Sequence, residues 1–460
     1  MEGTVYRTKA EVLKRAEEAI GIPLGEIDKT GRLQTGKGAI GTVIEESWYG
    51  YRPNAESEPD FPEAGVELKV TPYVRGKRGI RAKERLVCSI INYMEEYDRT
   101  FENSAFWHKC QTLLLMSYEH RYDRPKRDYK IDKAVLFSFP EEDLAIIRQD
   151  WERIMAKVRR GEAHRISEGD TLYLAACTKG AGRKTVRPQP FSPIPAKQRA
   201  YSLKASYMTH ILRAYIFGAQ KDERIVKDHR LLEKQSLEEY ICQKAAPYMG
   251  MTQRELKERF GIRSSPKNLN AMLLGRMLEV EGRIAATEEF KKAGIVPKTV
   301  RVRRDGKIQE SMSFPTFSFC ELIRETWEES TLRELLAPTR FLFVIFREDD
   351  RGELVFQRLQ FWNIPEDDLE EVHRVWQRTV DTIKRGVMLC EVDGEVRNDL
   401  PKASESRVAH VRPHGRNGED KLPLPDGRMM TKQCFWLNSS YISEQIRQGE
   451  ETSCEASEVL

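Results

Sequence analysis

The chain lacks the cysteine patterns and long apolar runs that define several protein classes. Its eight cysteines are scattered over 460 residues, with no CxxC pair and no Cys/His zinc spacing. We therefore expect reduced thiols in an intracellular protein. The longest apolar runs, such as residues 113–116, have the length of a strand and argue against a transmembrane helix. The charged start of the chain has no apolar core, so we expect no signal peptide.

The chain also has little net charge, only +4, but the charge is unevenly distributed. Residues 1–235 carry 42 Lys and Arg against 34 Asp and Glu, a net +8, whereas residues 236–460 carry 34 against 38, a net −4. Residues 151–200 hold 11 basic and 4 acidic residues. A basic half with a concentrated basic segment favours a polyanion partner such as DNA. Charge alone fits a solvated face equally well.

Two stretches, 140–161 and 365–386, repeat one another without a gap. They are identical at 8 of 22 positions, including Trp151/Trp376 and a closing Arg-Gly. Both begin with Pro and acidic residues and end at Gly, as helices do. Further blocks pair in the same order: 41–46 with 275–280, 60–70 with 289–299, and 200–207 with 435–441. This length and repetition predict two homologous domains.

We place the first domain at residues 1–215 and the second at 236–460. The segment between them, 216–235, is highly charged and is expected to be a solvated helical linker.

Asp60, Glu67 and Lys69 lie in one short run, DFPEAGVELK. If residues 65–70 form a strand, Glu67 and Lys69 leave the same face, because strand side chains alternate. Asp60 can return to that face from an adjacent strand or turn. Carboxylates are hard ligands that suit Mg²⁺, and a lysine beside the metal can position or deprotonate a water that attacks a phosphodiester. The pattern indicates the active site of a metal-dependent nuclease.

The second copy of this run has lost part of the set. Asp60 becomes Glu289 and Lys69 becomes Lys298, but Glu67 becomes Val296 and Leu68 becomes Pro297. A valine cannot ligate a metal, and a proline interrupts a strand's hydrogen bonds. We therefore expect the second copy to keep the fold without the chemistry.

Other candidates are weaker on spacing alone. Glu45, just upstream, is either a third metal-site carboxylate or a surface helix residue. The basic, Gly-rich tip around Lys179 and its parallel around Arg412 and Arg416 fit either a DNA groove or ordinary charged loops.

Six segments of residues 1–212 resemble, in order, motifs of the MutH family of DNA endonucleases. They are KGAIGTVIE, DFPEAGVELK, ENSAFWHK, RQDWERIM, LAACTKGAG and YSLKASY. The resemblance implies an α/β fold of the restriction-endonuclease type, with a mixed sheet flanked by helices and a DNA cleft. The repeat implies two such MutH-like domains in tandem, the second degenerate.

The resemblance also assigns roles to residues. It implies a catalytic set comprising Glu45, Asp60, Glu67, Lys69 and Lys109. Asp60, Glu67 and the Leu68 carbonyl would bind Mg²⁺, Lys69 would orient the attacking water, and Lys109 would assist catalysis or contact phosphate.

For DNA, the resemblance implies that Lys179, Gly180 and Arg183 approach guanine, and that Tyr201 and Lys204 face the duplex. Cys177-Thr178 stand where the repair enzyme of the family has Arg-Pro, so the assignment of residues to bases stays open.

The family cuts at GATC in duplex DNA, and its longer members are type II restriction enzymes. The resemblance therefore implies cleavage 5′ of the G to leave 5′-phosphates, in the bacterial cytoplasm, by a monomer or a DNA-induced dimer with no membrane partner. The second domain would bind DNA as an allosteric effector through Arg412 and Arg416, or be purely structural. The alternative function is methylation-directed nicking at GATC in mismatch repair.

Overall fold

The computed structural model describes residues 5–34, 36, 38–51, 58–77, 79–180, 185–220, 222–308, 311–392 and 395–458. The chain forms two compact units. Unit 1 comprises Met1–Leu237 together with Ala285–Ile295, and unit 2 comprises Glu238–Ile284 and Val296–Leu460. The segment 285–295, which the sequence repeat places in the second domain, thus belongs to unit 1.

Unit 1 combines sheets and helices. Its elements are α1 (Lys9–Glu17), α2 (Leu24–Ile27), α3 (Ala39–Val43), β1 (Glu67–Gly76), β2 (Gly79–Ala82), β3 (Leu86–Ile90), α4 (Tyr93–Glu96), α5 (Ala105–Cys110), β4 (Thr112–Glu119), β5 (Lys133–Ser138), α6 (Glu141–Arg159), β6 (Leu174–Thr178), β7 (Val186–Gln189), β8 (Ser192–Lys197), β9 (Arg199–Leu203), α7 (Ala205–Ile211) and α11 (Glu288–Ala293).

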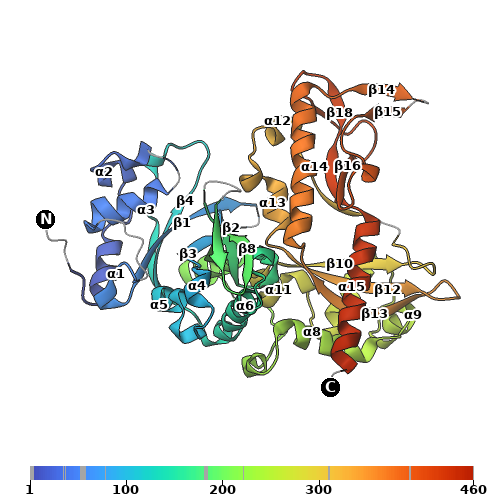
Figure 1. Ribbon diagram of the computed structural model, residues 1–460, viewed down its shortest axis with the longest axis horizontal. Coiled ribbons are helices and arrows are strands. Elements are labelled where there is room, and N and C mark those ends of the chain that lie inside the picture. Colours follow the sequence, from blue (N-terminus) through green and yellow to red (C-terminus); the bar gives the residue numbers. More distant parts are fainter. Residues whose placement is uncertain are drawn as a thin grey trace. The chain divides into compact units, whose positions relative to one another are not determined.

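The main sheet of unit 1 is mixed and has the order β2-β1-β4-β5. Strands β1 and β4 are parallel, with Lys69 opposite Leu115, whereas the β1–β2 and β4–β5 pairs are antiparallel. Residues 113–116 of β4 are fully buried, as expected for an apolar strand covered on both faces. Helix α1 packs on β4 and β5, and α3 packs on β1 (Figure 1). This packing places the helix that precedes Glu45 beside the start of β1.

A second sheet of unit 1 is antiparallel, with the order β3-β9-β6. Helix α6 packs against β6 and runs from Pro140 at its N-cap to a turn at Gly161 with φ +71°. The helix predicted over residues 140–161 is therefore confirmed. The buried Asp150 of α6 accepts the backbone N–H groups of Leu172, Tyr173 and Leu174 at 2.6–2.9 Å. The helix thereby holds the start of the strand that leads to Lys179.

Unit 2 also combines sheets and helices. Its elements are α8 (Leu237–Ala245), α9 (Gln253–Arg259), α10 (Leu269–Met277), β10 (Ile295–Val302), β11 (Met312–Thr316), α12 (Phe319–Leu322), α13 (Thr331–Leu336), β12 (Arg340–Glu348), β13 (Leu354–Trp362), α14 (Glu366–Arg385), β14 (Leu389–Val392), β15 (Glu395–Asn398), β16 (Ala409–Pro413), β17 (Lys421–Pro423), β18 (Met429–Thr431), β19 (Gln433–Leu437) and α15 (Ser439–Glu458).

The strand orders of unit 2 parallel those of unit 1. The orders β10-β12-β13, β11-β19-β16 and β17-β18 match β1-β4-β5, β3-β9-β6 and β7-β8 when elements are counted along the chain. Helix α14 corresponds to α6 and confirms the helix predicted over 365–386. The core of unit 2 buries Trp376 of α14 at the place that Trp151 has in α6.

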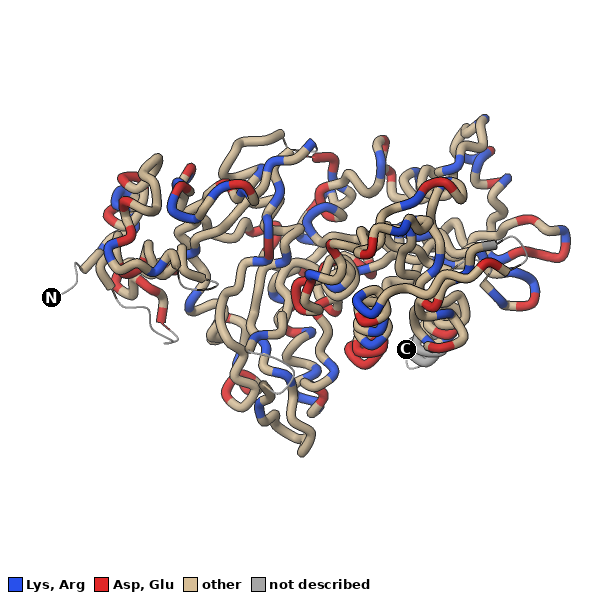
Figure 2. Tube along the Cα trace, turned by 90° about the horizontal axis from the view of Figure 1, so that it is seen from above, with Lys and Arg blue, Asp and Glu red and all other residues tan. Residues whose placement is uncertain are grey.

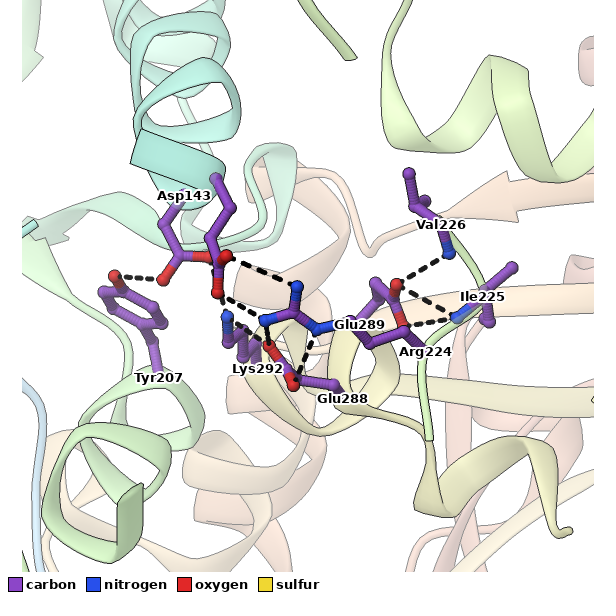
Figure 3. A network of polar contacts seen from close by, with 9 residues as sticks. Asp143, Tyr207, Arg224, Ile225, Val226, Glu288, Glu289 and Lys292 are labelled. Carbon is purple, nitrogen blue, oxygen red and sulfur yellow. Dashed lines mark hydrogen bonds and ion pairs between the residues drawn. The ribbon is translucent and has the colours of Figure 1, made fainter. Parts of the chain in front are cut away.

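The segment between the two repeats differs from the solvated helix expected for it. It contains a 3₁₀ turn at His229–Glu233, and Ile225 and Val226 are buried. The Glu289 carboxylate accepts the N–H groups of Ile225 and Val226 at 3.0 and 2.9 Å (Figure 3). Hydrogen bonds to the Glu289 carboxylate of α11 therefore fix this segment within unit 1.

Helix α11 is fixed to α6 by buried charges (Figure 3). Lys292 donates to Asp143 of α6 at 2.8 Å and pairs with Glu288 at 2.7 Å. Asp143 also accepts from the Tyr207 hydroxyl at 2.8 Å, and Arg224 bridges Glu142 and Glu288. Residues more than 140 positions apart thus share one ion network within unit 1.

Lys and Arg are interspersed with Asp and Glu along the trace rather than confined to one block (Figure 2). Within the residues that the structure describes, no helix is both long enough and apolar enough to cross a membrane.

Candidate active site

The start of β1 brings Asp60 and Glu67 together. Phe61 and Val66 form an antiparallel bridge around the 3₁₀ turn Pro62–Ala64, and Gly65 closes the turn at φ +63°, a conformation that favours glycine. The Leu68 N–H donates to Asp60 Oδ2 at 2.9 Å, and the Asp60 N–H donates to Glu67 Oε2 at 3.1 Å. Asp60 therefore returns to the strand through a turn, as its spacing predicts.

Two lysines converge on Glu67, whose side chain is almost fully buried. Lys69, on the same face of β1, donates to Glu67 Oε1 at 2.7 Å. Lys109 lies 3.6 Å from Glu67 Oε2 and donates to the Glu58 carbonyl at 3.1 Å. The strand predicted over residues 65–70 is confirmed from Glu67 onward, since Gly65 ends the preceding turn. Four of the five expected catalytic residues are joined by direct contacts.

Lys109 is supplied by the short helix α5. The Ser104 hydroxyl caps this helix by accepting the Trp107 N–H at 3.1 Å. The buried Glu96 accepts the Ala105 N–H at 2.8 Å, which fixes the same helix end. These caps satisfy backbone donors that a helix start leaves open, so they set where Lys109 points.

Glu45, the fifth residue, lies on the π-helical turn Ile44–Tyr49 that continues α3. It is half-buried, and burial raises its pKa, with a further rise from the charge of Asp60. Lys69 and Lys109 act in the opposite direction on the same pKa. Glu45 is thus electrostatically coupled to the residues of β1 and α5.

Burial also controls the charge state of the central pair. It raises the pKa of Glu67 to about 7, although Lys69 opposes the rise. Burial disfavours the charged form of Lys69, yet the Glu67 carboxylate raises the pKa of Lys69 on balance. A cation at this site would relieve the repulsion of Asp60 with Glu45 and with Glu67.

The residues present fit a divalent metal. Among the described residues, no group of three or more Asp, Glu, His and Cys side chains forms a ready-made metal cage. Magnesium, however, is usually bound through one or two carboxylates with several waters retained. Asp60, Glu67 and the Leu68 carbonyl would supply such a set of hard oxygen ligands.

Two expected DNA-contacting residues are corrected by the structure. Tyr201 is fully buried and donates to Glu96 Oε2 at 3.2 Å, so it supports the carboxylate that caps α5. Lys204 is 3 % exposed and donates to the Thr171 carbonyl. Tyr201 lies within β9, the buried middle strand of its sheet, and Lys204 directly follows that strand. Neither can contact DNA in this structure.

The loop after β6 retains two of the expected base-reading residues at the surface. Lys179 is exposed, and its N–H donates to the Gln198 carbonyl at 2.9 Å. Gly180 has φ +132°, and a Cβ there would come within 2.8 Å of Thr185. Arg183 lies outside the described residues.

In unit 2 both expected arginines are exposed. The Arg412 guanidinium lies 3.9 Å from the centre of the Trp436 ring, and Arg416 lies 3.5 Å from Asp420.

Sequence reasoning missed several residues that shape the site. The Glu58 carboxylate contacts the His108 ring at 2.9 Å, and the Glu58 backbone carbonyl accepts a hydrogen bond from Lys109. Tyr51 packs on Phe61, next to Asp60. In the sequence, only the position of Tyr51, six residues after Glu45, could have indicated that it lies near the site.

A buried glutamate with a half-buried aspartate and two lysines, at the start of a strand in a mixed sheet, defines a nuclease-type site. The model of the DNA mismatch repair enzyme MutH matches residues 49–150, which contain Asp60, Glu67, Lys69 and Lys109. The chain is 39% identical to the type II restriction enzyme Sau3AI of Staphylococcus aureus, over 96% of this chain and 99% of that protein.

Mismatch repair proteins MutH are similar over a smaller part. Those of Shewanella woodyi and Escherichia coli O139:H28 are 30% and 29% identical, over 47% and 39% of this chain and 97% and 79% of their own lengths. The chain belongs to the MutH-related family of type II restriction endonucleases. It is a nuclease.

Proposed function

We propose that the protein recognises GATC in duplex DNA and hydrolyses the phosphodiester 5′ of the G, leaving 5′-phosphates. The observation that carries this proposal is the contact of Lys69 and Lys109 with Glu67, beside Asp60. Similarity to Sau3AI along nearly the whole chain favours the restriction function over mismatch repair.

The chain's own residues divide the work of hydrolysis. Asp60, Glu67 and the Leu68 carbonyl would hold Mg²⁺, which would supply Lewis-acid charge and an activated water when bound. Lys69, kept protonated by Glu67, orients the attacking water by donating to it. Lys109 offsets charge on the phosphate. Lys179 approaches the guanine acceptors from the loop after β6.

We further propose that unit 2 is a second, degenerate MutH-like domain. Support comes from the matched strand orders, and from Gly65 and Gly294, which end the Pro62–Ala64 turn and helix α11 at φ +63° and +65°. Glu289, the counterpart of Asp60, is occupied with the N–H groups of Ile225 and Val226. Val296 stands in place of Glu67, so the cutting chemistry belongs to unit 1.

A plasmid assay tests the catalytic proposal. Wild type with Mg²⁺ should linearise plasmids that contain GATC, and Glu67→Ala should be reduced at least 10³-fold, about the loss of 4 kcal/mol of transition-state stabilisation. Glu63→Ala, an exposed carboxylate in the same turn, is the control and should cut normally. An intact plasmid with wild type, or equal cutting by Glu67→Ala, would sink the proposal.

The same gel separates restriction from repair-type nicking. Restriction predicts linear product, whereas methylation-directed nicking predicts open circles that accumulate on unmethylated DNA without a second cut.

For unit 2 we propose that Arg412 and Arg416 bind a second DNA site as an effector. Both are exposed, and Arg412 extends from β16, the counterpart of the strand that leads to Lys179. Substituting both by Ala should slow cleavage of two-site plasmids more than that of one-site plasmids. Unchanged rates on both plasmids would leave unit 2 with a structural role alone.

A further inference from the structure

Tyr51 is held against the active site by the helix that carries Glu45. The π-helical turn Ile44–Tyr49 ends at Gly50, whose φ of +78° reverses the backbone. The Tyr51 N–H then donates to the Glu45 carbonyl at 3.2 Å. Tyr51 is therefore fixed to the last turn of that helix.

The Tyr51 ring fills the space between this helix and the Asp60 turn. It packs edge-on against Phe61, with ring centroids 5.6 Å apart and an interplanar angle of 82°, and lies 6.5 Å from the Tyr49 ring. Phe61 directly follows Asp60. The ring is thus in contact with both segments that supply carboxylates from outside β1.

The hydroxyl of Tyr51 is buried and has no hydrogen-bond partner in the described part of the chain. A buried polar group without a partner costs free energy, so native proteins rarely keep one without a reason. Burial raises the pKa of Tyr51, and the charges of Asp60, Glu45 and Glu67 raise it further. The group is therefore a neutral O–H donor, packed beside the Asp60 turn and influenced by the charges of three carboxylates.

We propose that Tyr51 is a positioning residue of the metal site, whose hydroxyl donates to a carboxylate or water oxygen that coordinates the divalent ion. This inference rests on the metal-dependent cleavage proposed above. Partners of this kind orient the ligands, and their loss weakens metal binding or activity by roughly 10- to 100-fold.

The second repeat supports this assignment. Tyr51 lies between two paired blocks, 41–46 with 275–280 and 60–70 with 289–299, whose registers place Ala285 or Val280 opposite it. The repeat that has Val296 in place of Glu67 has therefore also lost the hydroxyl. Loss of both groups together is expected if the hydroxyl serves the metal site rather than the fold.

Tyr51→Phe tests the proposal, with Tyr49→Phe as its matched control. Each variant removes one oxygen from the same aromatic cluster, but Tyr49 donates to the Val12 carbonyl at 2.9 Å. Calorimetric titration of the full chain with Mg²⁺ should show binding about tenfold weaker for Tyr51→Phe. The Mg²⁺ concentration for half-maximal cleavage should rise by the same factor, with the rate at saturating Mg²⁺ within about twofold of wild type. Tyr49→Phe should bind Mg²⁺ as wild type does.

Melting temperatures without metal give a second readout. Tyr51→Phe should melt at or above the wild-type temperature, because it removes an unpaired buried group, whereas Tyr49→Phe should melt lower. Unchanged Mg²⁺ affinity in Tyr51→Phe, or an equal loss in both variants, would overturn the proposal. If wild type binds no Mg²⁺, the proposed metal site itself fails, and this inference with it.

Discussion

At the scale of single residues, Glu67 is the residue at which the contacts of the candidate site meet. It accepts from Lys69 and from the Asp60 N–H, and it lies beside Lys109. Its neighbours are cationic or donate to it, and its oxygens also suit a metal. In the proposed metal site, this one carboxylate would couple the charge of the lysines to that of the ion.

Metal binding should therefore depend on the protonation of Glu67. Burial raises the pKa of Glu67 from 4.5 to about 7, so the carboxyl keeps its proton up to near-neutral pH and a metal must displace it. Apparent Mg²⁺ affinity should fall roughly tenfold from pH 8 to pH 6, with about 0.9 proton released per ion at pH 6 and about 0.1 at pH 8. Calorimetry in buffers of different ionisation enthalpy measures this release.

The matched control is Glu63→Gln, which alters an exposed carboxylate of the same turn and should keep the pH dependence. A pH-independent affinity in wild type would show that Glu67 is already ionised without the metal.

The residue pattern alone predicted the contacts of Asp60, Glu67 and Lys69, because strand alternation and a Gly turn are local properties. It could not predict that Tyr51 packs beside the Asp60 turn, since that depends on a π-helical turn and on packing against Phe61. It failed for Tyr201 and Lys204 because burial depends on which strands pair on either side of β9.

At the scale of elements, helices were predictable from their ends. Pro140 and Pro365 begin α6 and α14, and Gly161 and Gly386 follow their last turns at positive φ. The function of α6 was not predictable, because Asp150 acts on backbone groups more than 20 residues away.

Removing this carboxylate should therefore loosen β6. Asp150→Ala leaves three buried N–H donors at residues 172–174 without their acceptor, and we expect a loss of about 3 kcal/mol in the free energy of unfolding. Urea denaturation followed by circular dichroism gives this value.

Glu152→Ala, in the same helix but at the surface with Arg159, should cost about 0.5 kcal/mol or less. Equal losses for the two variants would mean that the three hydrogen bonds add nothing to the stability of β6.

At the scale of the whole molecule, the order of the repeats does not coincide with the compact units. The repeat assigns residues 289–299 to the second copy, but 285–295 belong to unit 1. The sequence pattern could not predict that residues 285–295 belong to unit 1, because their placement depends on long-range contacts such as that of Lys292 with Asp143. The segment that the repeat pairs with the Asp60 turn is thus a structural part of unit 1.

This arrangement predicts a large effect from one lysine and a small one from its neighbour. Lys292 is 3 % exposed and pairs with Asp143 and Glu288, so Lys292→Met should leave two buried carboxylates without this partner. We expect a loss of about 3–5 kcal/mol in the stability of unit 1. Lys291→Met, which alters the partly exposed pair with Asp222, should cost about 1 kcal/mol or less. Limited proteolysis with identification of the first cleavage sites compares the variants: faster cutting within residues 5–237 is expected for Lys292→Met alone, and equal protection of both variants would contradict the role assigned to α11.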